Sequence, residues 1–270
     1  YSLTTVSVIP GMMKNKGASI QILDVPGLIE GAAEGKGRGR EVLSVIRSAD
    51  LLVIMAEAGK EEQFKSITDE LYKNGARVND TKPNIKISRT LSGGMRVNST
   101  VKQDLDRQTF IDIAKEFGVM NAEVTLMESL TLDRLMDCFA KNRTYVKGLF
   151  VVNKADKVLK SPGAKLIHIP GVLSISADKD VGLDELRDAI WEMLGLTRVY
   201  LRRPGQATDF LDAMVMTSKD TLGDVMKKIG NDFAQGIKEV KIWGPGSRFP
   251  GQKVSLTTPV QDGMEVMFVK

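Results

Sequence analysis

Cysteine and histidine are nearly absent from this 270-residue chain, which contains one of each. A single cysteine, Cys138, excludes an internal disulfide framework and fits a reducing compartment. The lone histidine, His168, lies in a hydrophobic stretch before Pro170, with no nucleophile or carboxylate pattern around it. We therefore expect Cys138 to be a buried helix residue and His168 to have no catalytic role.

Long apolar runs are also missing, so no segment approaches the length of a membrane span. The first residues lack the basic and then apolar pattern of a secretory signal. The composition, 42% hydrophobic and 27% charged, is ordinary for a soluble globular protein. We therefore expect a cytoplasmic protein without a membrane partner. The net charge of +4 mildly favours an anionic partner such as RNA.

Short apolar runs alternate with helical patterns in much of residues 1–197. The runs predict strands at 20–23, 51–55, 148–152 and 172–175. Apolar residues at helical spacing predict helices at 41–48, 61–74, 131–142 and 182–194. This alternation favours a parallel sheet with helices on both faces, and the strand at 51–55 is expected to be buried on both sides. Near the start, Pro10-Gly11 predicts the turn of a hairpin that leads into the strand at 20–23.

Residues 73–125 interrupt this alternation and predict an inserted α+β module. We expect short strands at 85–88 and 95–97 and a helix at 106–117. One acid, Asp80, stands among six basic residues: Lys73, Arg77, Lys82, Lys86, Arg89 and Arg96. They form either the solvated face of a small sheet or a surface that contacts phosphates. In the following helix, Asp133 and Asp137 are expected to face Arg134 and Lys141.

The last 70 residues predict a compact domain of several strands around one helix. Strands are expected at 199–202, 239–243, 254–256 and 264–269. The helix within 217–233 is expected to be capped by Asp220 or Thr221. The length suits two or three modules. We divide the chain into a first sheet segment (1–72), the insert (73–125), a second sheet segment (126–197) and a C-terminal domain (198–270).

A glycine-rich segment follows the predicted strand at 20–23 and suits a switch. Asp24 ends the strand in the motif D-x-x-G, and its carboxylate can hold Mg²⁺ through water. The N–H of Gly27 can meet a terminal phosphate, because no side chain is in the way. Thr5 is either one more β-branched strand residue or a hydroxyl ligand of Mg²⁺. Alone, D-x-x-G is a weak signal.

The sequence Asn153-Lys154-Ala155-Asp156 follows the strand at 148–152. An aspartate at this place can accept two hydrogen bonds from the N1–H and amino group of guanine, which adenine does not offer. The lysine stem can lie over the base, and the asparagine can tie the loop to its neighbours. Ser176-Ala177, after the next strand, can offer a backbone N–H to the guanine carbonyl. Three motifs in this order, each at the carboxyl end of a predicted buried strand, predict a guanine nucleotide site.

These motifs resemble those of the developmentally regulated GTP-binding proteins, the archaeal and eukaryotic branch of the Obg-related GTPases. The resemblance rests on Thr4-Thr5 with VIPG, on DVPGLIEGAAEGKGRGREVL, on VVNKAD and on SISAD. It implies an α/β Ras-like P-loop GTPase sheet, an insert like ribosomal S5 domain 2 and, from WGPGS and FPGQKV, a C-terminal β-grasp TGS domain. It also implies GTP hydrolysis, Mg²⁺, and association with ribosomes or structured RNA. Thr5 and Gly27 would then take the catalytic positions, and a regulatory protein partner is expected.

The chain departs from the family pattern in two places. The phosphate loop G-x-x-x-x-G-K-[ST] should precede Thr5, and the segment at 31–37 is too short between its glycines and lacks the hydroxyl. We therefore expect an N-terminal portion with that loop and its strand to be missing from this sequence; a 270-residue molecule alone would bind nucleotide weakly or not at all. Leu28 stands where Ras-like enzymes place a glutamine, so we expect slow hydrolysis that K⁺ or a partner assists.

Two functions remain open from the sequence. The leading one is a GTPase switch that acts on ribosomes, with Asp24 and Thr5 on Mg²⁺, Gly27 on the γ-phosphate, and the residues Asn153, Lys154, Asp156, Ser176 and Ala177 on guanine. The alternative is a non-enzymatic protein that binds RNA or ribosomes and keeps a degenerate nucleotide fold. A plain α/β protein with chance tetrapeptides is the third interpretation.

Overall fold

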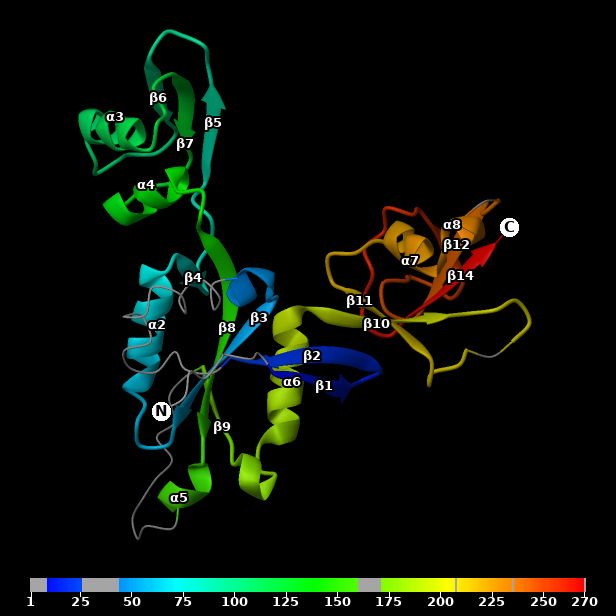
Figure 1. The fold of residues 1–270 in the computed structure, drawn as a ribbon. Helices are drawn as coiled ribbons and strands as arrows, with labels where there is room; N and C mark the ends of the chain where they lie inside the picture. Colours follow the sequence, from blue (N-terminus) through cyan, green and yellow to red (C-terminus); the bar gives the residue numbers. More distant parts are fainter. Residues whose placement is uncertain (1–8, 26–43, 160–170, 207, 235, 270) are drawn as a thin grey trace. The chain divides into compact units, whose positions relative to one another are not determined.

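The computed structural model describes residues 9–25, 44–159, 171–206, 208–234 and 236–269 (Figure 1). They divide into two compact units. One unit holds the described residues up to 25, residues 53–64 and those from 149 onward. The other holds residues 44–52 and 65–148. Within the described part of the chain, no helix is both long and apolar enough to cross a membrane. The expectation for His168 falls outside the described residues.

The strands that carry the base-recognition motif form a sheet with parallel pairs. Strand β8 (Thr144–Asn153) lies between β3 (Leu51–Glu57) and β4 (Ala76–Val78), and it also pairs with β9 (Val172–Ser174). The β4–β8 and β8–β9 pairs are both parallel, as the alternation of strands and helices predicts. The helices that the apolar spacing predicts at 61–74 and 182–194 are present as α2 (Gln63–Lys73) and α6 (Leu183–Leu194). Residues 44–48 are also helical.

Strand β3 is not buried on both faces, contrary to the prediction from its continuous apolar run. Ile54 and Ala56 are buried, whereas Val53 and Met55 are each 40% exposed. Side chains alternate across a strand, so one face of β3 meets the core and the described residues leave the other partly open. A continuous apolar run therefore overstated the burial of this strand.

Strands β1 (Ile9–Asn15) and β2 (Ala18–Asp24) form a two-stranded antiparallel hairpin. The predicted turn at Pro10-Gly11 is wrong, because both residues lie inside β1. The turn is formed by Lys16 and Gly17, both at positive φ (46° and 84°), as a tight two-residue hairpin requires. Pro10 is tolerated because it lies on a strand that pairs on one side only among the described residues.

The second unit contains a three-stranded sheet in the order β5 (Ile85–Arg89), β7 (Ala122–Leu126), β6 (Met95–Ser99). Helices α3 (Arg107–Glu116) and α4 (Leu132–Phe139) lie beside it (Figure 1), and their apolar residues share one core with the sheet. Asp106 caps α3 by accepting the N–H of Thr109. Helix α4 thus packs on the predicted insert, beyond the boundary predicted at residue 125; the domain boundaries stay a prediction.

Cys138 lies in helix α4, as predicted, but it is only partly buried against this core, whereas the sequence predicted a buried residue. Its thiol donates to the carbonyl of Arg134 at 3.1 Å. Burial raises the pKa of the thiol to about 12, so it stays protonated and unreactive at neutral pH.

A buried ion cluster ties α4 to β4. The carboxylate of Asp137 accepts from both Nε and Nη2 of Arg77, at 2.5 and 2.7 Å, and from Nε of Arg143 at 2.6 Å. Arg77 also stacks on Tyr72, with its guanidinium carbon 3.6 Å from the ring centre. Two predictions are therefore wrong: Asp137 does not face Lys141 across neighbouring turns, and Arg77 does not belong to an exposed basic surface. Both side chains point inward because an arginine fork can satisfy a buried carboxylate.

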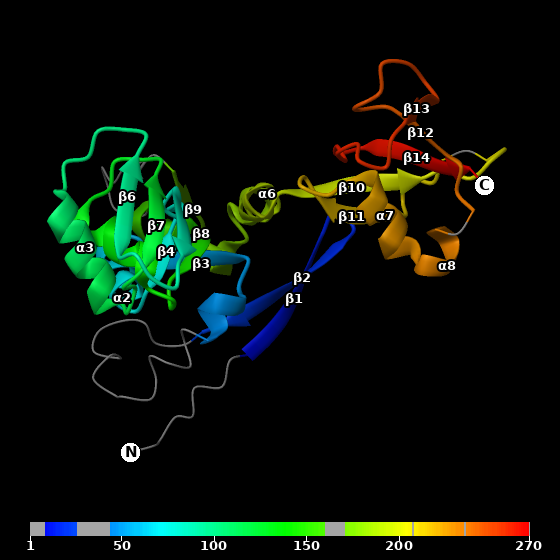
Figure 2. The ribbon, with the colours of Figure 1, turned by 90° about the horizontal axis from the view of Figure 1, so that it is seen from above.

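The C-terminal residues form a five-stranded mixed sheet with two short helices beside it (Figure 2). The strand order is β11 (Ala213–Thr217), β10 (Leu196–Leu201), β14 (Met264–Val269), β12 (Glu239–Trp243), β13 (Gln252–Val254). Helix α7 (Leu222–Ile229) packs on it, and α8 (Asn231–Ala234) follows. Thr221 caps α7 in a reciprocal capping box with Asp224, one of the two caps predicted.

Candidate functional site

The predicted base-recognition residues lie together at one edge of the sheet. Asn153 is the last residue of β8, and Ser176 follows the end of β9 by two residues. The two strands are parallel with Val152 opposite Ser174, so their carboxyl ends reach the same edge (Figure 1). Asp156 lies in the first turn of the short helix α5 (Ala155–Leu159), directly after β8. This edge is where open parallel sheets bind their ligands.

Asn153 fastens three chain segments to one another. Its side-chain oxygen accepts the N–H of Lys154 at 2.7 Å and the N–H of Ala177 at 3.1 Å. Its backbone carbonyl accepts the N–H of Ala58, just after β3, at 2.9 Å. The side chain thus ties the loop to its neighbours, as the sequence predicts. The Ala177 N–H, which the sequence assigns to a guanine carbonyl, is directed at Asn153 here.

Ser176 supports the aspartate of the motif. Its hydroxyl donates to Oδ1 of Asp156 at 2.6 Å, and the serine is only 1% exposed. The Ser176 backbone forms a reciprocal bridge with Val181, at 2.9 and 3.1 Å, which closes the loop after β9. The hydroxyl therefore fixes one carboxylate oxygen of Asp156 from the interior.

Gly182, which begins helix α6, is required by the packing of this loop. Its φ is +74°, and a Cβ at this position would lie 2.8 Å from the carbonyl oxygen of Ser174. An L side chain would be strained in its backbone and would also collide with the end of β9. The glycine lets α6 start close to the end of β9, the strand that precedes Ser176.

Lys154 has an unusual backbone and a carboxylate partner that the sequence prediction missed. Its φ of 62° is in the left-handed region. Its ammonium lies 3.1 Å from Oε1 of Glu57, the last residue of β3. Hydrogen bonds from Lys154 and then Lys60 lower the pKa of Glu57 to about 2, so this carboxylate is ionised at neutral pH. The sequence did contain one signal for Glu57: it is an acid directly after an apolar run, and the strand of that run ends at the same sheet edge as the motif.

Of the remaining predicted residues, only Asp24 is described, and it is not part of this group. Thr5 and Gly27 lie outside the described residues. Asp24 ends β2 and is exposed, and β2 belongs to the two-stranded sheet rather than to the sheet of Asn153. The prediction that Asp24 follows a buried strand is therefore wrong, since Ile22 and Leu23 are 45% and 37% exposed. Among the residues described, no three His, Cys, Asp or Glu side chains gather as a metal site.

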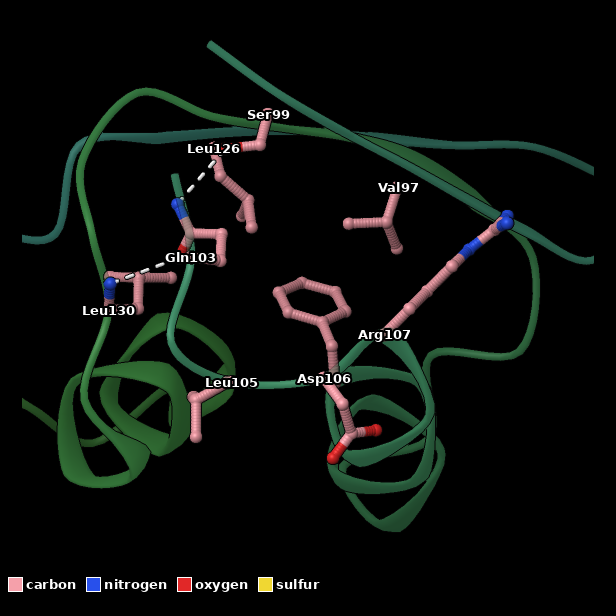
Figure 3. A pocket seen from close by; sticks show the side chains of 9 residues that line it. Val97, Ser99, Gln103, Leu105, Asp106, Arg107, Leu126 and Leu130 are labelled. Atoms are coloured by element: carbon pink, nitrogen blue, oxygen red, sulfur yellow. Dashed lines mark hydrogen bonds between the residues drawn. The ribbon is translucent and has the colours of Figure 1, made fainter. Parts of the chain in front are cut away.

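A small pocket lies elsewhere, between α3 and the three-stranded sheet (Figure 3). Its walls include Val97, Leu105 and Leu126. The amide of Gln103 is already satisfied, because it donates to Glu128 O at 2.7 Å and accepts from Leu130 N at 3.1 Å. Asp106 and Arg107 also line this mostly apolar pocket, but their charged groups point in different directions (Figure 3), and the base-recognition motif has no part in it.

Two family models match the chain. Residues 1–89 match the model described as "50S ribosome-binding GTPase". Residues 92–196 match the model described as the C-terminal region of that domain. Both models together cover the sheet segments and the insert.

Curated relatives match almost the whole chain. An uncharacterized GTP-binding protein of Methanocaldococcus jannaschii is 38% identical, over 97% of this chain and 69% of its own length. Human developmentally-regulated GTP-binding protein 2 is 36% identical, over all of this chain and 75% of its own length. Among solved structures, a GTP binding protein from Pyrococcus horikoshii aligns with a TM-score of 0.37 at 15% identity, over 62% of this chain and 57% of that one.

Proposed function

The chain belongs to the developmentally regulated GTP-binding proteins, and we propose that it binds GTP and hydrolyses it to GDP and phosphate as a switch that acts on ribosomes. It is a GTP-binding member of the 50S ribosome-binding GTPase family, with an α/β fold of the P-loop GTPase kind. Hydrolysis, the ribosomal target and the roles of individual residues are the parts that we propose.

The observation that carries the proposal is the single sheet edge that holds the whole base-recognition motif. Asn153 ties the two loops, and Ser176 orients Asp156 by a 2.6 Å hydrogen bond. A carboxylate held in this way can pair with the N1–H and amino group of guanine. A base without these donors would leave the carboxylate unsatisfied, which can discriminate by about 10⁴-fold. Lys154 would cover the base, and the Ala177 N–H would turn from Asn153 to the guanine carbonyl.

We assign the phosphate end of the site to Asp24, Thr5 and Gly27. Asp24 is exposed at the end of β2, and an accessible carboxylate suits water-mediated binding of Mg²⁺, which keeps several of its waters. When bound, Mg²⁺ would neutralise charge on the phosphate oxygens. Thr5 would offer its hydroxyl to the ion, and the Gly27 N–H would donate to the γ-phosphate. Leu28 cannot orient a water, so slow hydrolysis with help from K⁺ or a partner is expected.

The effector surfaces would be the insert and the C-terminal sheet. Arg77 is buried, but Lys86, Arg89 and Arg96 are exposed on β5 and β6 and can contact RNA phosphates. We further propose that the insert is an S5-domain-2-like module and that residues 198–270 form a TGS domain. The four predicted domain ranges, a regulatory protein partner and a cytoplasmic location belong to the same proposal.

The proposal is tested by nucleotide selectivity in the full chain. Fluorescent mant-GDP is titrated into wild type and Asp156→Asn, with adenine and xanthine nucleotides as competitors. Wild type should prefer guanine. The Asn variant should lose that preference and favour xanthine, because an amide can donate to the additional carbonyl of xanthine.

The matched control is Asp178→Asn, which removes an exposed carboxylate two residues after Ser176 and should leave selectivity unchanged. Equal competition by adenine nucleotides against wild type would overturn the proposal. Binding of ribosomes or RNA without any nucleotide binding would favour the non-enzymatic alternative.

A further inference from the structure

Glu57 lies at the centre of a group of lysines beside the base-recognition motif. Its Oε1 is 3.1 Å from the ammonium of Lys154 and 3.7 Å from that of Lys157, and its Oε2 is 3.2 Å from that of Lys60. The carboxylate is about one-third exposed, with a side-chain exposure of 29%. Glu57 comes from β3, 97 positions before Lys154. The fold, and not local sequence, brings the two together.

The backbone around this pair is fixed on both sides. The Ala58 N–H donates to the carbonyl of Asn153 at 2.9 Å, which fastens the end of β3 to the start of the motif. The N–H of Lys154 donates to the Asn153 side chain, and the Ala155 N–H donates to Ile175 O at 3.0 Å. The Cα–Cβ bond of Lys154 therefore has a set direction, although its four-carbon stem remains free to rotate. The position of the ammonium decides where that stem lies.

We propose that Glu57 is a positioning residue for nucleotide binding: it holds the ammonium of Lys154 so that the methylene stem lies as a platform for one face of the guanine base. This inference rests on the proposed function. Glu57 does not touch the base itself; it acts through Lys154. Glu57 holds the Lys154 side chain in place before the nucleotide binds. The side chain therefore loses less conformational entropy on binding, and this favours the complex.

The geometry separates Lys154 from the other two lysines. Lys60 reaches the opposite carboxylate oxygen and lies three residues after Glu57, and Lys157 lies farther away at 3.7 Å. Only Lys154 belongs to the N-K-x-D motif. The inference therefore predicts a coupling between Glu57 and Lys154 that the other two lysines do not share.

The test is a double-mutant cycle for mant-GDP binding in the full chain. Glu57→Gln keeps the side-chain size and removes the charge, and it should weaken binding about two- to fivefold, as expected for a partly exposed ion pair. In a Lys154→Ala background the same substitution should have no further effect. In Lys60→Ala and Lys157→Ala backgrounds its effect should persist. Glu57→Asp should restore part of the loss.

Two further readouts separate positioning from a structural role. GMP and GTP should lose affinity by the same factor in Glu57→Gln, because the effect arises at the base and not at the phosphates. The loss should shrink at high salt, which screens an exposed pair. The matched control, Glu61→Gln, removes an acid whose carboxylate accepts the N–H of Gly59, and it should bind like wild type.

The outcomes distinguish this inference from the proposed function. If wild type prefers guanine but Glu57→Gln binds equally well, the positioning role is overturned and the function stands. An equal loss with and without Lys154 also overturns the positioning role. If wild type does not prefer guanine, the proposed function and this inference both fail.

Discussion

Asp137 and Glu57 each sit among several cationic side chains, but one carboxylate is buried and the other is near the surface. Asp137 meets two arginines, and its side chain is 4% exposed. Glu57 meets three lysines whose side chains are 48–63% exposed. Arginine presents a planar fork that binds a carboxylate in one geometry, whereas lysine is a point charge on a flexible stem. The arginine cluster around Asp137 is therefore suited to holding two elements in a fixed geometry. The lysine cluster around Glu57 is suited to a contact that can rearrange.

The comparison shows that counting charges does not reveal what a cluster does. Removing one partner from a buried pair leaves an uncompensated charge in the interior, which is costly. Removing one partner from an exposed pair lets water solvate the other. We therefore expect substitutions at Asp137 to affect stability and substitutions at Glu57 to affect nucleotide binding.

The largest expected effect is that of Asp137→Ala. It leaves Arg77 buried without its carboxylate, and we expect a loss of about 3–5 kcal/mol in the free energy of unfolding. Urea unfolding followed by far-UV circular dichroism measures it, because Trp191 and Trp243 both lie in the other unit. Asp133→Ala, an exposed acid on the same helix, is the control. A loss as small as that of the control would contradict a structural role for the cluster.

The same cluster should make stability depend on pH in the acid range. Burial by itself would raise the pKa of Asp137, but the hydrogen bonds from Arg77 and Arg143 outweigh it and lower the pKa below its usual 3.8. A depressed carboxyl pKa stabilises the fold fully above the unfolded-state value, and this stability is lost as the pH falls through the folded-state value. The stability difference between wild type and Asp137→Asn should thus be constant from pH 5 to 7 and shrink below about pH 4. A difference that grows on acidification would refute this assignment.

Tyr145→Phe should change the free energy of unfolding less than Asp137→Ala does. It should either leave the stability unchanged or increase it. The hydroxyl of Tyr145 is buried without a hydrogen-bond partner among the described residues, and burial raises its pKa to about 12. Its removal relieves an unsatisfied polar group, so we expect unchanged stability or a gain of up to about 1 kcal/mol. The same urea unfolding measures it. A loss above 1 kcal/mol would mean that the hydroxyl has a partner in solution.

The smallest effect on stability is expected for Glu57→Gln, although this variant should weaken nucleotide binding. Its carboxylate and its lysine partners remain in contact with water, so their separation leaves no buried charge. We expect an unfolding midpoint equal to that of wild type in the absence of nucleotide, measured by tryptophan fluorescence of the first unit. A clearly lower midpoint would contradict this prediction, because it would mean that Glu57 stabilises the fold as Asp137 does.

Much of the fold follows from local patterns. Strands β12 and β14 begin and end where the sequence predicts, and α3 lies within the helix predicted at 106–117. Strands β7 and β11 were not predicted. β7 has Ala and Glu, which are poor strand formers, and it is a strand because β5 and β6 pair with it on both sides.

The candidate site shows the same division between local and distant information. The motif residues from Asn153 to Ala177 could be placed at one edge, because parallel strands end on the same side of a sheet. Glu57 could not be identified, since an acid after an apolar strand is common and its partner is distant in sequence. The burial of the Arg77 side chain could not be predicted either, because the sequence does not show that Asp137 is buried beside it.

The lone thiol of Cys138 has a practical consequence for future measurements. Because its pKa is raised to about 12, it should react slowly with maleimides at neutral pH in the folded protein. A new cysteine at the fully exposed Leu91 or Leu211 could then carry a dye without removal of the native one. Each unit would thereby offer its own labelling position, so that a dye could report on the unfolding of one unit at a time.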